Sequence, residues 1–292
     1  MKRLLFLLLL IPVLSFGQKV YTYGGDAVTY NGEVVRTVVY CTEYQAVYDE
    51  YIIKPDDAIA VQQNLMVNSM VTEGVWAKLD IFYVLANNVQ SSALINWKNP
   101  GAFTATEVDA PVFTAYEGYT GSSGAPNKYL TTGFTPSIHG TVIAQNSACV
   151  GVYSRTTGVE NKTEMDSAGS IAYISIRVLY TGTNTGGYLN DVSFQGAPIV
   201  GNTGAGMYSL NRHVSNLVYK IMNGINYGNT GGVSNSTGLP DGEVTILRGG
   251  TANSNRQVSG AWLGGSLSDA EHLAFKNAFE TYMDFLGNGV IP

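Results

Sequence analysis

Charged residues are scarce in this 292-residue chain, which has 16 lysines and arginines against 22 aspartates and glutamates. The formal net charge is −6, and no run of basic residues occurs in the sequence. A protein that binds the phosphate backbone of nucleic acids needs a basic patch. The composition therefore argues against nucleic acid as a partner.

Cysteine is equally scarce, with only Cys41 and Cys149 in the chain. In an exported protein the two could form a disulfide. It would close a loop of more than a hundred residues, worth about 4 to 5 kcal/mol on the loop-entropy estimate. The alternative is two separate buried thiols, which behave as small apolar side chains. The sequence leaves both alternatives open.

The three histidines, His139, His213 and His272, lie far apart, and none has a partner at the spacing of metal ligands. The sequence also lacks the Gly-x-Ser-x-Gly, His-Glu-x-x-His and phosphate-loop motifs. These residues therefore predict neither a metal centre nor a cofactor site.

An apolar run at residues 4–14 follows Lys2 and Arg3 and precedes a small-x-small sequence at residues 15–17. This three-part pattern is typical of a signal peptide over residues 1–17, and the run is shorter than the roughly 20 residues of a spanning helix. We expect an exported, extracellular protein. An uncleaved membrane anchor or a buried helix is the alternative.

Glycine and tyrosine are abundant, at 34 and 19 residues. Over residues 94–136, short apolar runs alternate with Gly and Pro turn chemistry, and each run is too short for a helix. This pattern predicts a mainly β protein, an antiparallel jelly-roll β-sandwich, over residues 76–292. Residues 171–180 give its clearest strand, with Ala172, Ile174, Ile176, Val178 and Tyr180 on one face.

Residues 18–75 predict a small β/α appendage before the sandwich. Asn31-Gly32 indicates a hairpin over residues 28–35, and residues 37–41 read as a further strand. A helix should begin near Pro55 and end near Gly74. The apolar run at residues 81–86 is either a buried strand or a last helical turn, which the pattern alone does not decide.

A hairpin and a C-terminal helix are also predicted in the second half of the chain. Asn223-Gly224 indicates a hairpin. Ser268 and Glu271 form a capping-box pair that opens a C-terminal helix, which Gly287 should end.

Glu107 and Asp109 are the sharpest enzymatic candidates. Jelly-roll glycoside hydrolases use a strand reading Glu-x-Asp-x-x-Glu, but the third position here is Val112. Without a second catalytic carboxylate, the retaining mechanism has no acid/base. We therefore expect a protein that is not an enzyme, with a secreted carbohydrate-active enzyme as the alternative.

Sugar binding needs exposed aromatic rings near amides and hydroxyls, and tyrosines beside Gly- and Asn-rich loops meet this need. More often such rings cover a sandwich edge. The long polar loop over residues 226–241 is where binding usually resides. The predicted ligand-binding residues are Tyr188, Tyr208, Tyr227, Asn229 and Asp241.

Calcium is the one cofactor that the loops suggest. Asn190-Asp191 and Asp241-Gly242-Glu243 supply oxygen ligands of the kind that Ca²⁺ prefers. The alternative is that these side chains cap turns through local hydrogen bonds. The sequence gives no Asp-x-Asp-x-Asp run, so a site without any cofactor is the main expectation.

One stretch resembles a bacteriophage structural-protein family that has a concanavalin-like (laminin-G-like) jelly-roll domain. The resemblance extends from about Tyr44 to Gly287 and is carried by Asn96-Trp97-Lys98-Asn99-Pro100, Phe103, Pro111-Val112-Phe113-Thr114, Gly118-Tyr119, Tyr129-Leu130, Gly133-Phe134 and Pro136. It implies a virion or tail-associated binding protein that contacts a host-surface glycan or virion subunits, as a homo-oligomer by analogy. The leader departs from this family, which favours a host-encoded secreted surface protein as a further alternative.

Overall fold

The computed structural model describes residues 28–30, 33–35, 39–122, 124–229, 232–250 and 253–292. The chain forms two compact units, Met1–Val39 and Tyr40–Pro292. In the first unit, strands β1 (Val28–Tyr30) and β2 (Glu33–Val35) pair antiparallel, which confirms the strands of the predicted hairpin. Its Asn31-Gly32 turn and the leader over residues 1–17 lie outside the described residues.

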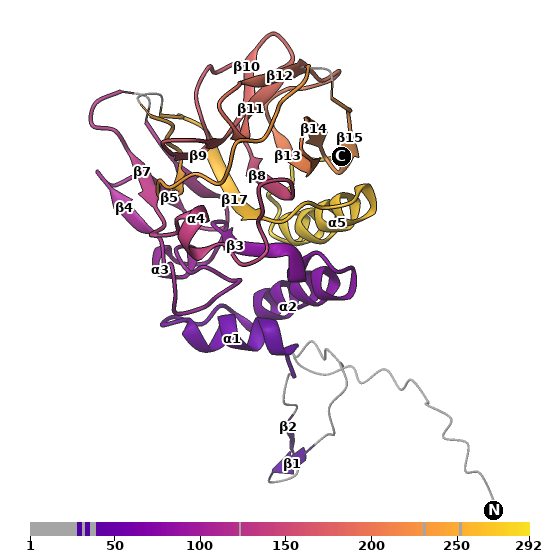
Figure 1. The fold of residues 1–292 in the computed structure, drawn as a ribbon. Coiled ribbons are helices and arrows are strands. Elements are labelled where there is room, and N and C mark those ends of the chain that lie inside the picture. The colour runs from indigo at the N-terminus through magenta and orange to yellow at the C-terminus, as the bar shows by residue number, and fades with distance from the viewer. Residues whose placement is uncertain (1–27, 31–32, 36–38, 123, 230–231, 251–252) are drawn as a thin grey trace, which may run out of the picture. The chain divides into compact units, whose positions relative to one another are not determined.

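The second unit contains helices and strands in a mixed order along the chain (Figure 1). Its helices are α1 (Thr42–Glu50), α2 (Asp57–Thr72), η1 (Trp76–Lys78, a 3₁₀ turn), α3 (Gln90–Ala93), α4 (Pro136–His139) and α5 (Asp269–Phe285). Its strands are β3 (Leu79–Val84), β4 (Thr106–Val108), β5 (Val112–Thr114), β6 (Gly118–Thr120), β7 (Tyr129–Thr131), β8 (Ala148–Ser154), β9 (Met165–Ala168), β10 (Tyr173–Thr181), β11 (Asn184–Asp191), β12 (Gln195–Pro198), β13 (Gly206–Val214), β14 (Leu217–Met222), β15 (Ile225–Asn226), β16 (Thr245–Ile246) and β17 (Gln257–Gly264).

These strands build two antiparallel sheets, which confirms the predicted mainly β sandwich with a C-terminal helix. The seven-stranded sheet has the order β12-β11-β10-β9-β16-β7-β4. The eight-stranded sheet has the order β15-β14-β13-β8-β17-β6-β5, and β3 also pairs with β17.

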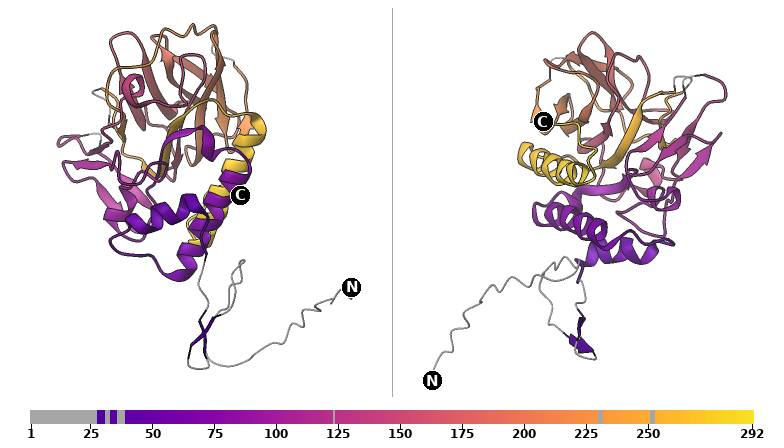
Figure 2. Two further views of the ribbon diagram at one scale, coloured as in Figure 1. Left: turned by 60° about the horizontal axis from the view of Figure 1, so that its bottom comes forward. Right: turned by 180° about the vertical axis from the view of Figure 1, so that it is seen from behind.

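The central strands β3, β8 and β17 of the eight-stranded sheet are almost entirely buried on both faces. Strand alternation directs Tyr83 of β3 into a core between the two sheets, whereas Phe82 enters a second core against the helices. In that second core Phe275 of α5 contacts both Phe82 and Trp262. The unit therefore has three layers, two sheets and a helical layer, and Figure 2 shows yellow α5 next to purple α2 within the helical layer.

Several predicted local structures are confirmed. The apolar run at residues 81–86 belongs largely to β3, whose six residues are all buried, so the strand alternative is correct. Ser268 and Glu271 form the capping box at the start of α5. The Asn223-Gly224 turn, with φ of 54° and 79°, joins β14 to β15.

Helix α2 confirms the helix predicted between Pro55 and Gly74, whereas the segment before it differs from the sequence-based expectation. Residues 42–50 form α1, which the sequence did not predict, and residues 39–41 are not a strand. Tyr44 of α1 and Met70 of α2 are fully buried in the core against the eight-stranded sheet. The compact unit begins at Tyr40, whereas the sequence-based prediction assigned residues 18–75, with their one predicted helix, to an appendage.

The two cysteines are free thiols, Cys149 buried and Cys41 half-buried. The alternative of two separate thiols is therefore the one that the structure shows. Of the helices in the described ranges, none combines the length and the apolar character that a membrane span requires.

Strand β10 departs from simple alternation near its end. Ile174, Ile176 and Val178 point into the core, as predicted. A register shift between Arg177 and Thr181 then breaks the pattern. Leu179 is buried in the core, whereas Tyr180, predicted on the buried face, is half-exposed. The irregularity places Tyr180 among the residues of the outer face.

Candidate functional site

The outer face of the seven-stranded sheet carries a row of polar side chains in register. Five neighbouring strands contribute Tyr188, Ser175, Asp166, Thr245 and Thr131, each paired directly with the next. Because the residues next to them in these strands lie in the core between the sheets, alternation directs this row outward. Four strand spacings of about 4.8 Å make the row about 19 Å long, and we call this surface the outer face.

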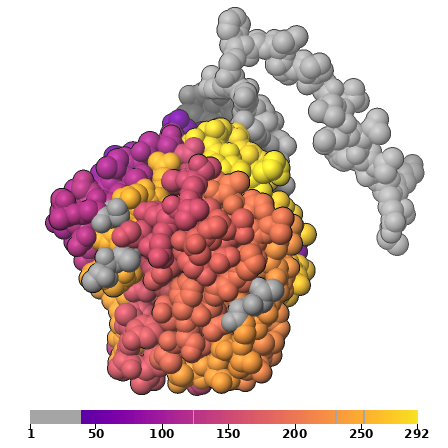
Figure 3. Space-filling model, turned by 90° about the horizontal axis from the view of Figure 1, so that it is seen from above, coloured from indigo at the N-terminus to yellow at the C-terminus, as the bar shows by residue number. Residues whose placement is uncertain are grey.

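Figure 3 shows the side of the second unit opposite α1 and α2. The rose-to-orange part of the chain, which contains β9 to β14, covers most of the surface in this view. Strands β9 to β12 in this part belong to the seven-stranded sheet, whereas β13 and β14 belong to the eight-stranded sheet, whose other face packs against the helical layer.

Four aromatic rings form a continuous strip at the β12 end of the outer face. The ring centroids of Tyr173 and Tyr188 lie 5.4 Å apart, and those of Tyr188 and Phe194 also lie 5.4 Å apart. Tyr180 continues the strip at 5.1 Å from Phe194. Tyr173 is 37% exposed and the other three rings are half-buried, so the aromatic strip presents ring surface to solvent.

Two glycines beneath the aromatic strip allow the rings to lie close to the sheet. A Cβ atom on Gly196 would lie 2.1 Å from the hydroxyl oxygen of Tyr180. A Cβ atom on Gly186 would lie 3.0 Å from Cε1 of Phe194. Since only glycine leaves this space free, the strip is shaped by the backbone as well as by the rings.

Two guanidinium groups flank the middle of the outer face. Arg177 lies over the ring of Phe194 at 5.1 Å, and its Nη1 donates to Asn161 Oδ1 at 2.9 Å. Arg248 lies over the ring of Tyr129 at 4.5 Å and donates to the Tyr129 hydroxyl at 2.7 Å. Stacking of this kind holds a guanidinium in a fixed plane and leaves its edge free for a partner.

Asp166 lies between these two arginines on β9. Partial burial raises the pKa of its carboxyl group to about 6, while the Gly250 N–H and the charges of Arg177 and Arg248 oppose this rise. The carboxyl group is therefore partly protonated in mildly acidic solution.

The structure gives the predicted ligand-binding residues different environments. Tyr188 lies in the aromatic strip. Tyr208 is fully buried, with its hydroxyl donating to Asn202 Oδ1 at 2.8 Å, so the proposal that its ring stacks on a ligand is corrected. Alternation explains this placement, because Tyr208 lies on the core side of β13.

Tyr227 and Asn229 lie together beside Lys220, and Asp241 lies elsewhere. The backbone N–H of Tyr227 donates to the carbonyl of Lys220 at 2.9 Å, and Lys220 Nζ donates to Asn229 Oδ1 at 3.4 Å. Asp241 is exposed and accepts hydrogen bonds from the backbone N–H and the hydroxyl of Ser170. The structure therefore unites two of the five predicted residues, and neither is in the aromatic strip.

The carboxylates suggested for calcium are engaged by protein donors. Asp191 accepts hydrogen bonds from the N–H groups of Val192 and Ser193 and lies 3.8 Å from Arg212. Glu243 accepts from the N–H of Gly133 at 2.5 Å. Within the described residues, no group of three or more His, Cys, Asp or Glu side chains is placed to hold a metal ion.

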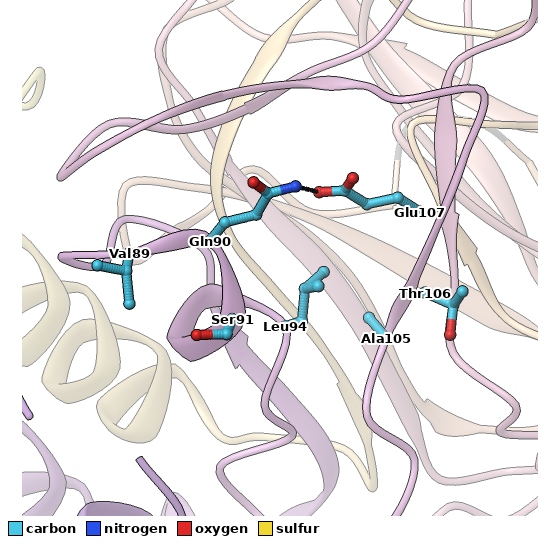
Figure 4. Close-up of a pocket in the computed structure, with 7 residues that line it drawn as sticks. All are labelled: Val89, Gln90, Ser91, Leu94, Ala105, Thr106 and Glu107. Carbon is cyan, nitrogen blue, oxygen red and sulfur yellow. Dashed lines mark hydrogen bonds between the residues drawn. The ribbon is translucent and has the colours of Figure 1, made fainter. Parts of the chain in front are cut away.

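A separate open pocket of about 570 Å³ contains Glu107 (Figure 4). Glu107 Oε1 accepts hydrogen bonds from Gln90 and, at 2.5 Å, from the hydroxyl of Tyr119. The lining residues are Val89, Gln90, Ser91, Leu94, Ala105, Thr106 and Glu107.

Glu107 is the single carboxylate among these lining residues, and Asp109 lies beyond the end of β4, exposed and with φ of 54°. Hydrolysis by either common glycosidase mechanism requires two carboxyl groups across the sugar. The lining residues of the pocket thus supply one of the two carboxyl groups that hydrolysis requires.

The sequence-based reasoning missed Tyr173, Arg177 and Phe194. The first two could have been found, because they alternate with the buried residues of the predicted strand and must face outward. Phe194 precedes β12 and carries no comparable pattern, so only the fold shows that it joins the strip.

Comparisons with known proteins give distant likenesses only. No protein-family model matches the chain, and no curated protein matches it. The binding domain of botulinum neurotoxin serotype D superposes with a TM-score of 0.48 at 11% identity, covering 72% of this chain and 53% of that one. Trypanosoma rangeli sialidase in complex with sialic acid gives a TM-score of 0.46 at 9% identity, covering 76% and 40%.

A smaller neighbour is covered almost completely. Domain 4 of AbnA, a GH43 extracellular arabinanase from Geobacillus stearothermophilus, in complex with arabinotriose, gives a TM-score of 0.39 at 12% identity. The match covers 68% of this chain and 98% of that domain. This chain spans about half the length of the toxin chain (53%), and at these TM-scores the neighbours carry no argument about its function.

Proposed function

We propose that this protein is a non-enzymatic glycan-binding module displayed outside the cytoplasm, either on a cell surface or on a virus particle. The aromatic strip on the outer face carries this proposal. Exposed rings beside amide, hydroxyl and guanidinium groups can stack on sugar rings while the polar groups bind the hydroxyls. Gly186 and Gly196 allow the rings of the aromatic strip to lie close to the sheet, so that an extended glycan chain can lie across it.

Binding without catalysis is supported by the distribution of carboxylates. Glu107 is the one acid among the residues that line its pocket. On the outer face, Asp166 lies between two arginines rather than opposite a second acid. The proposed display outside the cytoplasm and the proposed membership of a phage structural family rest on the leader and on the sequence resemblance.

A glycan array tests the proposed function, with Tyr188→Ala as the site variant. We expect the parent to retain a glycan and Y188A to bind it about tenfold more weakly or worse, which corresponds to a loss of about 1.4 kcal/mol. Tyr219→Ala is the matched control, because Tyr219 is also stacked on an aromatic neighbour, His213 at 4.6 Å, but lies on the eight-stranded sheet. Equal binding by parent and Y188A would contradict the site.

Two further measurements separate the alternatives. Incubation of the intact protein with a panel of polysaccharides should release no reducing sugar, and cleavage that disappears in Glu107→Gln would favour the enzyme instead. Proteomics of purified particles, culture medium and cell envelope would show where the protein resides. Absence from particles would remove the phage proposal and leave the glycan site intact.

A further inference from the structure

The outer face contains two arginines without a carboxylate partner. Within the described residues, neither Arg177 nor Arg248 has an acidic oxygen within ion-pair distance, whereas Arg155 and Arg212 each have one acidic partner and Arg256 has two. This is unusual for a chain with a net charge of −6, in which acidic side chains outnumber basic ones.

Both guanidiniums have donors to spare. Each carries five N–H donors. Arg177 uses Nη1 on Asn161 and Nε on Thr163 at 3.3 Å, and Arg248 uses Nη1 on Tyr129. No protein acceptor in the described ranges is recorded for Nη2 of either arginine, and both side chains are half-exposed.

The two groups belong to one site. Arg177 donates to Thr163, and a Cβ atom on Gly249, the residue after Arg248, would lie 2.3 Å from Cβ of Thr163. Asp166 interacts electrostatically with both arginines, although neither reaches it as an ion pair. A ligand that lies along the row from Tyr188 to Thr131 would pass both guanidiniums.

From this geometry we infer that the ligand is an anionic glycan, whose carboxylate or sulfate groups are bound by Arg177 and Arg248. The inference rests on the proposed glycan-binding function and specifies its ligand class. A planar guanidinium with a free edge binds a carboxylate or a sulfate through charge-assisted and often bidentate hydrogen bonds. The aromatic strip would bind the sugar rings, and the arginines would select the charge.

Asp166 offers a test in which a substitution should strengthen the binding of an anionic glycan. Its carboxylate lies where an anionic ligand would pass, and like charges repel. Asp166→Asn keeps an acceptor for the Gly250 N–H and removes the negative charge. We expect D166N to bind an anionic glycan more tightly, whereas Arg177→Gln and Arg248→Gln should each weaken it.

Titration calorimetry with paired polysaccharides tests the inference. The probes are dextran sulfate against dextran, and polygalacturonate against its methyl ester, so that sulfate and carboxylate are examined separately on matched backbones. The parent should prefer at least one anionic member by about tenfold or more, the value expected for a charge-assisted hydrogen bond. R177Q and R248Q should each reduce that preference, and added salt should weaken it.

Lys54→Gln is the matched charge control. Lys54 is also a cation over an aromatic ring, 4.5 Å from the centroid of Tyr48, but it lies beside α1 in the helical layer. K54Q should therefore bind as the parent does, and thermal unfolding of all variants would show that they are folded. Arg177→Lys, which keeps the charge and loses the planar fork, should restore part of the R177Q loss.

The outcomes separate the inference from the proposed function. Equal affinity for charged and neutral probes, with both lost in Y188A, would overturn the anionic ligand and leave glycan binding in place. A preference for anionic probes that K54Q reduces as much as R177Q would also overturn it, because the attraction would then be unspecific. A protein that binds none of the probes and nothing on a glycan array would overturn both.

Discussion

Asp80 provides a direct test of how the sandwich is held together. It lies on β3, is 7% exposed, and accepts four hydrogen bonds from the segment that leads into β8. Oδ1 accepts from the N–H and hydroxyl of Thr141 at 2.6 and 2.7 Å and from the N–H of Val142 at 3.1 Å, and Oδ2 accepts from the N–H of Ile143 at 2.8 Å. One carboxylate therefore fixes three consecutive residues.

The expected change in the free energy of unfolding follows from the hydrogen bonds that each donor loses. Thr141 is exposed, so in Asp80→Ala its donors can turn to water at small cost. The N–H groups of Val142 and Ile143 are less accessible, and each unsatisfied buried donor costs about 1 to 3 kcal/mol. We therefore expect D80A to lower the free energy of unfolding by about 3 to 5 kcal/mol. Asp80→Asn keeps one oxygen but turns an NH₂ group toward the N–H of Ile143, so its cost should be about 2 kcal/mol.

Urea unfolding followed by fluorescence of the buried tryptophans measures these differences. Asp49→Asn is the control, because Asp49 is an exposed carboxylate that accepts one hydrogen bond from Gln45. It should stay within about 0.5 kcal/mol of the parent. A D80A variant less than about 1 kcal/mol below the parent would refute the reasoning.

Two further predictions concern thiols and protons. Burial raises the pKa of Cys149 to about 12 and also raises the pKa of the half-buried Cys41, so a thiol reagent should label at most Cys41 in the folded protein. In urea both should react without prior reduction, and a requirement for reductant, seen by mass spectrometry, would indicate a disulfide. Burial lowers the pKa of His272 from 6.5 to about 4, so the unfolded chain binds a proton that the folded protein does not bind between these pH values. The free energy of unfolding of the parent should therefore fall more steeply than that of His272→Leu as the pH drops from 6.5 to 4, and equal slopes would contradict this assignment.

Tyr188 and Tyr208 show how far the candidate site was predictable. Both lie beside Gly- and Asn-rich segments, and both were predicted to bind the ligand. One faces solvent in the aromatic strip and the other is fully buried, because they occupy opposite faces of their sheets relative to the core. A shift of one residue exchanges the two faces of a strand, so loop proximity alone does not distinguish them.

Local chemistry in the sequence was enough to predict several of the elements. Gly and Pro punctuation fixed short strands, the Asn223-Gly224 pair fixed a hairpin, and Ser268 with Glu271 fixed the start of α5. Each of these depends on dihedral preferences and hydrogen bonds within a few residues. For that reason the mainly β sandwich and its closing helix could be predicted.

Only the tertiary structure decided which strands are neighbours and which rings meet. The aromatic strip joins Tyr173, Tyr188 and Phe194 from separate segments. Strand β10, which carries Arg177, and strand β16, which ends two residues before Arg248, lie on either side of β9 in the sheet. The helical layer packs against the eight-stranded sheet, whereas the outer face belongs to the seven-stranded sheet. Strand order and register depend on the packing of the whole core. The stability of a strand comes from side-chain packing against neighbouring strands, and its register is set by which face is buried.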